Sequence, residues 1–480
     1  MTNTFYFYDL ETSGFNPREA RIMQFGGQRT DMELNPIGKP HDVLIKMTDD
    51  VVPEPDAILV TGITPQRTLQ DGISEVEFLK LFSEEIAVPG TIFVGFNTVR
   101  FDDEFMRFLL YRNFYDAYEW QWMDGKSRWD LLDLVRMTRA LRPEGIKWPV
   151  DSQGIATNRL ELLASINGLI HENAHDALSD VMASIELAKL IKTKQPDLFN
   201  YLLKIRTKDE VKKIVNSDQA FVYTSGKYAS EFEKTTVVAT VCEHPSQSGG
   251  ALEFDLRHDP TPYASMDAGA LAEAWRRRRD DSGPRLPVKT LKYNRCPAIA
   301  PLGVLDEPSQ QRLGLDQKIY MENFKKLQKV KKELCSKIKQ AVELLDKKQQ
   351  AKLLEDEVEV DSRLYDGFFG GEDKTKMGLV RSATGEELNS IDTSFHDQRL
   401  QTLLSLYKAR NYSGIMTDED RTVWENYRNR KLLSGGNTSR LGRFFACLGE
   451  LAEQKGLSDE KRYLLEELQL YGQSIMPEET

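Results

Sequence analysis

The feature that most constrains the fold is an aromatic run, FYFY at 5–8, that leads directly into Asp9 and Glu11. Four consecutive aromatic residues suit a strand that is buried on both faces, as strands inside α/β sheets are. Strand-like runs recur at 22–31, 43–46 and 91–96, and helix-like runs lie at 74–86, from 101 onward and after 175. This alternation predicts an α/β domain over residues 1–194.

Local signals mark where some of these elements begin and end. Ser74 and Glu77 have the spacing of a capping box at the start of the helix expected at 74–86. Pro65 follows Thr64 and fits the first position of another helix. The sequence Asn-Pro-Ile-Gly at 35–38 predicts the turn between the second and third strands.

The chain changes character after residue 195. A β-rich domain is expected over 196–350, with strands at 221–225, 235–242, 251–256 and 287–293 and a helix near 267–279. It ends in a long basic helix at 316–349 with an apolar stripe formed by Phe324, Leu327, Leu334, Ile338 and Leu345. The acidic stretch 355–361 marks a boundary, and residues 352–480 have the Leu, Lys, Glu and Arg spacing of a helical domain.

Composition places the chain among soluble globular proteins. At 480 residues it is long enough for several domains, and it contains no run of roughly 18 to 20 apolar residues that could span a membrane. Its four cysteines show no metal-binding spacing, and no signal peptide is apparent, so a reduced cytoplasmic setting is expected. The net charge of −11 does not exclude a nucleic-acid partner, because binding depends on where the charges lie.

Asp9 and Glu11 are two residues apart on a predicted strand, so their side chains leave the same face. Two carboxylates in that position suit hard divalent cations, which prefer oxygen ligands. The pair alone is weak, since about one or two such matches arise by chance in a chain of ordinary composition. Further acids in register are needed to distinguish a metal site from a solvated strand end.

Two such acids follow. Asp102 opens a helix directly after the strand at 91–96, at the edge where α/β folds place their sites. Asp180 falls inside a helix among apolar residues, an unfavourable position for an unpaired carboxylate, and His175 stands just before that helix. Asp103 and Glu104 are interpreted only as acids that favour a helix N-terminus.

The segments DLETSG (9–14), NTVRFDDE (97–104) and HDALSD (175–180) resemble the histidine-bearing branch of the DEDD superfamily of 3′–5′ exonucleases. This resemblance implies a ribonuclease-H-like mixed sheet with two metal ions, normally Mg²⁺, with Mn²⁺ as an alternative. The expected ligands are Asp9, Glu11, Asp102 and Asp180. A histidine with an ordinary pKa suits a general base, so His175 is assigned that role.

The resemblance extends along nearly the whole chain. The Gly-Ile-Thr loop at 59–66, the aromatic and arginine-rich segment from 111 to 149, LYDGFF at 364–369 and the run 391–412 resemble the exodeoxyribonuclease I family of bacterial enzymes. The family implies an SH3-like middle domain and a helical last domain that together surround single-stranded DNA. It also implies digestion from 3′ to 5′, release of nucleoside 5′-monophosphates, and a role in DNA repair and recombination.

Candidate DNA contacts combine basic and aromatic side chains, because a single strand offers both phosphates and open base faces. They are Thr61, Gly62, Arg107, Arg112, Tyr118, Trp122, Arg136 and Arg159, together with Glu11. Core packing is as good an explanation as stacking for each of Trp120, Trp122 and Trp129. Arg159 is interpreted as a phosphate ligand, with a nearby acid as the alternative partner.

Two basic clusters lie outside the first domain: Arg276 to Arg279 with Arg285, Lys289, Lys292 and Arg295, and the lysine-rich helix at 316–349. They are solvated surface, a guide for single-stranded DNA, or, as the resemblance suggests, the receptor for the acidic tail of a single-stranded DNA-binding protein. We expect the protein to be a monomer and to have no membrane partner. The alternatives are an oligoribonuclease, which the extra domains disfavour, and an inactive single-strand-binding scaffold.

Overall fold

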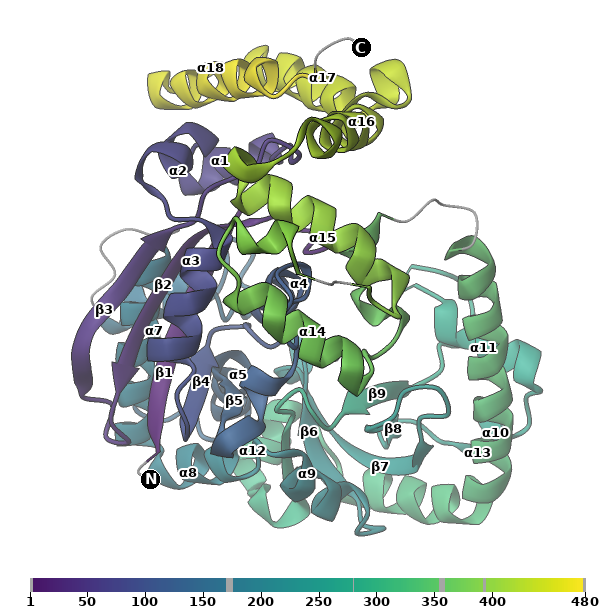
Figure 1. Cartoon of the computed structure of the whole chain (residues 1–480). Coiled ribbons are helices and arrows are strands. Elements are labelled where there is room, and N and C mark those ends of the chain that lie inside the picture. The colour runs from purple at the N-terminus through teal and green to yellow at the C-terminus, as the bar shows by residue number, and fades with distance from the viewer. Residues whose placement is uncertain (1–2, 170–175, 279, 354–358, 392–393, 478–480) are drawn as a thin grey trace.

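The N-terminal domain is built on a mixed sheet of five strands in the order β3-β2-β1-β4-β5. In the computed structural model, which describes residues 3–169, 176–278, 280–353, 359–391 and 394–477, β1 pairs antiparallel with β2 and parallel with β4 (Figure 1). The strands are β1 (Thr4–Thr12), β2 (Ile22–Thr30), β3 (Pro36–Leu44), β4 (Thr91–Gly95) and β5 (Ser127–Asp130). The expected α/β domain with a mixed sheet is confirmed.

Side chains of β1 alternate between two apolar layers. Phe5 and Phe7 pack with α5 (Leu131–Leu141) and α7 (Ala177–Lys194), whereas Tyr6 and Tyr8 pack with α3 (Glu75–Leu81) and α4 (Asp102–Arg112). Because the strand is covered on both faces, its aromatic residues are all buried. Asp9 continues the Phe5–Phe7 register and therefore faces the α7 side.

Helix starts follow the sequence signals closely. Ser74 and Glu77 form the predicted capping box at the start of α3, and Thr64 caps α2 (Pro65–Asp71).

The predicted turn at 35–38 is wrong, because β3 already begins at Pro36. The chain instead turns over 31–35, where the Asp31 carboxylate accepts a 2.8 Å hydrogen bond from the Asn35 amide. Proline is tolerated in β3 because that strand lies at the sheet edge.

The second domain contains an antiparallel five-stranded sheet in the order β10-β6-β7-β8-β9. Its strands are β6 (Phe221–Thr224), β7 (Thr235–Glu243), β8 (Gly250–Asp255), β9 (Val288–Lys292) and β10 (Ala298–Pro301). The long helix α13 (Gln317–Leu353) contacts β7, α10 (Thr261–Ala264) and α11 (Ala268–Arg276). On α13, Leu327, Leu334 and Ile338 of the predicted apolar stripe are buried.

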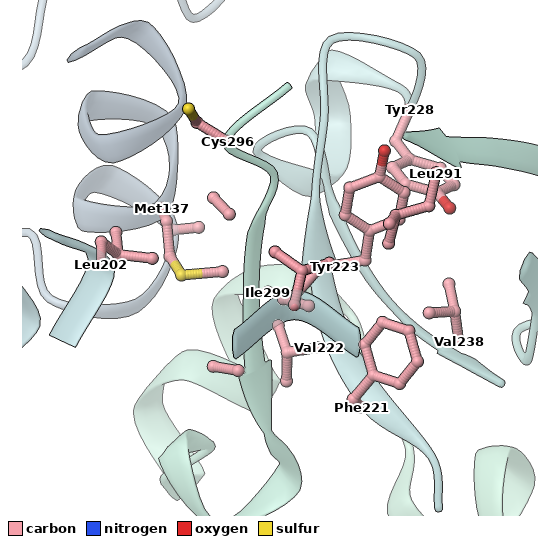
Figure 2. Packing of buried hydrophobic residues seen from close by; sticks show 14 of the residues in the cluster. Met137, Leu202, Phe221, Val222, Tyr223, Tyr228, Val238, Leu291, Cys296 and Ile299 are labelled. Atoms are coloured by element: carbon pink, nitrogen blue, oxygen red, sulfur yellow. The ribbon is translucent and has the colours of Figure 1, made fainter. Parts of the chain in front are cut away.

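The first two domains share one apolar core. Met137 of α5 and Leu202 of α8 (Pro196–Lys204) lie beside Val222 of β6 and Ile299 of β10 (Figure 2). Two further helices, α9 (Lys208–Val215) and α12 (Glu307–Leu313), contact β10 and α5 respectively. The sheet of the second domain therefore packs directly against the N-terminal domain.

The C-terminal part is helical, as predicted. It consists of α14 (Gly371–Ser382), α15 (Gln398–Asn411), α16 (Asp418–Leu433), α17 (Arg440–Ala452) and α18 (Asp459–Ser474). Helices α17 and α18 pack on α1 (Pro55–Thr61), and α18 also contacts α2, at the top of Figure 1. None of the helices in the described part of the chain has the length and apolar character needed to cross a membrane.

A buried charge cluster joins the N- and C-terminal domains. Asp50 accepts hydrogen bonds from Arg410 at 2.7 Å and Lys431 at 2.6 Å, and Asp361 accepts from Arg21 and Arg410, both at 2.7 Å. The side chains of all five residues are buried, with at most 5 % of any one exposed. Buried charges require such pairing, so the two domains are held in one fixed arrangement.

Candidate active site

Three carboxylates converge where β1 meets α7. Oxygen atoms of Asp9, Glu11 and Asp180 all lie within 4.8 Å of one another. The strand places Asp9 and Glu11 on one face, and α7 covers that face with Asp180 in its first turn. A set of carboxylate oxygens alone fits hard divalent cations such as Mg²⁺.

Asp102 completes the acidic group from the start of α4. It is 3 % exposed, and its Oδ1 accepts a 3.1 Å hydrogen bond from the Leu10 amide, between Asp9 and Glu11 in the chain. Burial, with Asp103 and Asp130 nearby, raises the pKa of Asp102 to about 8. Asp102 thus lies against the strand that carries the other two acids.

The acids strongly oppose one another's ionisation. Burial, and then the negative charges of Asp102 and Glu11, raise the pKa of Asp9 well above its usual range. Burial, followed by the charge of Asp180, raises the pKa of Glu11 to about 9. Positive charge placed among these groups would relieve that repulsion, which is the electrostatic signature of a cation site.

Asp176 is a neighbouring acid that the sequence reasoning did not single out. It caps α7 by accepting from the Ser179 amide at 3.0 Å, and it also accepts from Gln24 Nε2 at 3.0 Å. It thereby fixes the start of α7 against β2. An acid before a helix is a common cap, so the sequence carried little signal of this second contact. The prediction for His175 falls outside the described residues.

The interpretation of Asp103 as a mere helix-end charge is corrected. Asp103 is 1 % exposed, accepts a 2.5 Å hydrogen bond from the Tyr8 hydroxyl, and forms an ion pair with Arg128 of β5. It therefore links β1, α4 and β5 beside the carboxylate group. Both partners come from distant segments, so their approach could not be predicted from local pattern.

A cavity of about 600 Å³ opens beside the carboxylates and is lined by Asp9, Asp180, Arg136 and Arg159, among others. Arg136 pairs with Asp133 at 2.8 Å. Arg159 pairs with Glu161, the alternative partner considered for it, yet 66 % of its side chain is exposed. These two candidate DNA contacts therefore lie next to the acidic group.

A larger cavity of about 870 Å³ lies along α4 between the three domains. Among the described residues that line it, eight are basic and one is acidic. The basic residues are Arg18, Arg107, Lys126, Arg128, Arg206, Lys208, Lys292 and Arg295, and the acid is Glu104. Such a lining favours an anionic polymer despite the negative net charge of the chain.

Aromatic side chains line the same cavity. Trp122 is 61 % exposed there, whereas Trp120 and Trp129 are 5 % and 3 % exposed and pack in the core. Tyr118 lines the cavity under the Arg107 guanidinium, 5.8 Å from its ring centroid. The structure therefore separates the tryptophans, which periodicity alone had left equivalent.

The predicted DNA contact at Arg112 is corrected. Arg112 is 3 % exposed and donates through its Nε to both oxygens of Glu75, at 3.0 and 2.8 Å. It ties α4 to α3 and presents no surface to a ligand. Thr61 and Gly62 end α1, where Gly62 adopts a left-handed φ of 70° with open space around it.

A mixed sheet with an acidic cluster on its central strand, together with a basic cavity between the domains, is the arrangement expected of a metal-dependent nuclease. Consistent with this, residues 6–188 match the family model described as exonuclease. Residues 206–343 match the exonuclease I SH3-like domain, and residues 358–475 match the exonuclease I C-terminal domain.

Individual relatives agree along the full length. The chain is 37 % identical to exodeoxyribonuclease I of Haemophilus influenzae, over 98 % of this chain and 99 % of that protein. It is 35 % identical to Escherichia coli ExoI in a zinc-bound complex with single-stranded DNA, with a TM-score of 0.90, covering 99 % and 100 % of the two chains. A structure of an ExoI/SSB-Ct complex matches with a TM-score of 0.91, 35 % identity and the same coverage.

The chain belongs to the exodeoxyribonuclease I family and is a hydrolytic nuclease. The family resemblance expected from the sequence is confirmed, as is the order of a ribonuclease-H-like, an SH3-like and a helical domain. Matches over the two later domains favour this family over an oligoribonuclease, which corresponds to a nuclease domain alone.

Proposed function

We propose that the chain degrades single-stranded DNA from 3′ to 5′ and releases nucleoside 5′-monophosphates with the aid of two divalent cations. Mg²⁺ is the proposed physiological ion, and Mn²⁺ a functional substitute. The observation that carries the proposal is the cluster of Asp9, Glu11 and Asp180 oxygens within 4.8 Å of one another. The cavity between the three domains, with eight basic lining residues, supports it.

The acids would hold the cations, with Asp102 as the fourth ligand-bearing residue. Bound divalent cations supply the positive charge that stabilises an in-line displacement at phosphorus. His175, which precedes α7 in the chain, is proposed to accept the proton of the attacking water. Arg136 and Arg159, beside the carboxylates, would orient the phosphate through charge-assisted hydrogen bonds.

Strand selectivity follows from the larger cavity. Exposed Trp122 and half-buried Tyr118 offer ring faces on which unpaired bases can stack, and Arg107 lies above the Tyr118 ring. A duplex hides its base faces, so it would lose this contribution. Thr61 and Gly62 are proposed to contact the terminal nucleotide. The single-stranded DNA complex of the E. coli relative supports the same substrate class.

A protein partner is also proposed: the acidic tail of a single-stranded DNA-binding protein, supported by the ExoI/SSB-Ct complex of a relative. Lys292 and Arg295 line the large cavity and are assigned to DNA. The lysine-rich face of α13 and Arg276 to Arg278 remain for the tail, and Arg279 lies outside the described residues. We further propose a monomeric cytoplasmic enzyme of DNA repair and recombination, with domains at 1–194, 196–350 and 352–480.

The substrate class is tested by comparing single-stranded DNA, RNA and duplex DNA of equal length and sequence, each with Mg²⁺ or with EDTA. The expected result is Mg²⁺-dependent nucleotide release that is at least about tenfold faster on single-stranded DNA than on either other substrate. Equal or faster digestion of RNA would favour the oligoribonuclease reading. No metal-dependent release from any substrate would favour the inactive scaffold.

A further inference from the structure

Glu104 is the one acid among the described residues that line the large basic cavity. Its Oε1 accepts hydrogen bonds from Arg107 Nη1 at 2.7 Å and from Arg295 Nη2 at 3.1 Å, and its Oε2 accepts from the Tyr365 hydroxyl. Arg295 follows β9 in the SH3-like domain, and Tyr365 precedes α14 in the C-terminal domain. One carboxylate therefore joins all three domains inside the cavity.

This contact is separate from the acidic cluster. Glu104 lies two residues after Asp102 on α4, so the two side chains leave the helix about 200° apart. The Asp102 carboxylate accepts from the Leu10 amide, whereas Glu104 faces Arg295 and Tyr365. A change at Glu104 therefore acts on the cavity and not on the group of acids.

The ion pairs around Glu104 are enclosed. Side-chain exposure is 15 % for Glu104, 9 % for Arg107 and 33 % for Arg295. At such low exposure the attraction is screened less than at an open surface. The carboxylate therefore offsets part of the positive charge that the cavity would otherwise present.

DNA phosphates need the same donors. Arg128, another cation of the lining, already donates to Asp103 and to the Asn294 carbonyl, and Lys126 pairs with Asp124. Arg107 and Arg295 are held by Glu104, whose oxygens have the same preference for guanidinium groups as phosphate oxygens do. A strand that enters the cavity competes with Glu104 for these two guanidinium groups.

We propose that Glu104 competes with DNA phosphates for Arg107 and Arg295, and that this competition sets how tightly the cavity holds a single strand. This inference rests on the proposed function, in that the cavity is taken as the path of the DNA. With DNA bound, phosphates pair with the two arginines in place of Glu104. When the strand leaves, the arginines pair with Glu104 again, which offsets the loss of their phosphate contacts. The affinity for the strand therefore stays low enough for the strand to move.

The test is equilibrium binding of a fluorescent single-stranded thymidine oligonucleotide by the full chain in EDTA, across a series of salt concentrations. Glu104→Gln is expected to lower the Kd about tenfold at low salt. The slope of log affinity against log salt should steepen by about 0.7 for each arginine released. The matched control is Glu119→Gln, which makes the same charge change at a residue that pairs with Lys374 and lies outside this cavity lining.

Glu104→Asp serves as the milder variant if the glutamine substitution impairs folding, because it keeps the charge but shortens the reach to Arg295 and Tyr365. It should tighten binding by a smaller factor. Equal Kd and slope for Glu104→Gln and Glu119→Gln, or weaker binding by Glu104→Gln, would refute the proposed competition. Arg295→Gln separates the two levels: it weakens binding if the cavity carries DNA, and no effect of Arg295→Gln would instead refute the DNA path.

Discussion

Neutralising Asp50 should destabilise the protein far more than removing Lys431, although the two residues share a 2.6 Å hydrogen bond. The buried cluster contains three cations, Arg21, Arg410 and Lys431, against the two anions Asp50 and Asp361. Asp50→Asn leaves three buried cations facing one carboxylate. Lys431→Met leaves two against two and replaces the ammonium by an apolar group of similar length.

The magnitudes follow from that imbalance. Removing one partner of a buried ion pair costs about 3–5 kcal/mol, because it leaves uncompensated charge. Replacing the surplus cation should cost less than about 1 kcal/mol, since buried ions exchanged for packed apolar groups are often neutral in effect. Burial lowers the pKa of Lys431, so the surroundings of this ammonium group disfavour its charge.

The assay is urea unfolding combined with limited proteolysis at the junction of the N- and C-terminal domains. Arg410 and Lys431 hold the pKa of Asp50 well below its ordinary value, so its contribution is present above about pH 4 and is lost as the pH falls through the folded-state pKa. The difference between wild type and Asp50→Asn should therefore shrink in acid. If Lys431→Met costs as much as Asp50→Asn at pH 7, the reasoning from charge balance is refuted.

Four further predictions concern single sites. Glu253 is 0 % exposed and burial raises its pKa to about 8, so its stabilising effect is complete below about pH 4.5 and is lost as the pH rises to 8. Glu253→Gln should therefore raise the free energy of unfolding by on the order of 3 kcal/mol at pH 8 but by little at pH 4.5. A lower free energy of unfolding at pH 8 would contradict this. Because the pKa of Glu11 is raised to about 9, Mg²⁺ binding near pH 7 should release protons, visible in calorimetry as a dependence of the apparent enthalpy on buffer ionisation that fades above pH 9. Trp122→Ala should weaken single-strand binding by about 1–3 kcal/mol with unchanged melting, whereas Trp120→Ala should lose about 3–5 kcal/mol of stability; the reverse ranking would refute the stacking assignment. His175→Ala should lower kcat by about 10²–10⁴ at neutral pH with little change in KM, and wild-type turnover would remove His175 as the base.

Local chemistry explains what could be predicted from the sequence. The aromatic run before Asp9, the capping box at Ser74 and the helix start at Pro65 depend on neighbours within a few residues. The grouping of Asp9 and Glu11 follows from strand periodicity. Only the approach of Asp180 required knowledge of how α7 lies on the sheet.

What could not be predicted depends on partners from distant segments. In the sequence, Arg112 resembles any other arginine of its segment. In the structure it is buried and paired with Glu75 of α3. Glu104 and Asp103 look like ordinary first-turn acids, yet one meets Arg295 and Tyr365 and the other meets Arg128 and Tyr8. Helical acids carry no mark of such tertiary pairing in a single sequence.

The account is tested most directly by following a 5′-labelled single-stranded oligonucleotide in Mg²⁺ with wild-type protein and with Asp9→Asn. The predicted result is a ladder that shortens from the 3′ end, with nucleoside 5′-monophosphates as products, no digestion in EDTA, and none by the variant. A labelled mononucleotide appearing before the strand has shortened, or undiminished digestion by Asp9→Asn, would contradict a metal-dependent 3′–5′ exonuclease centred on these carboxylates.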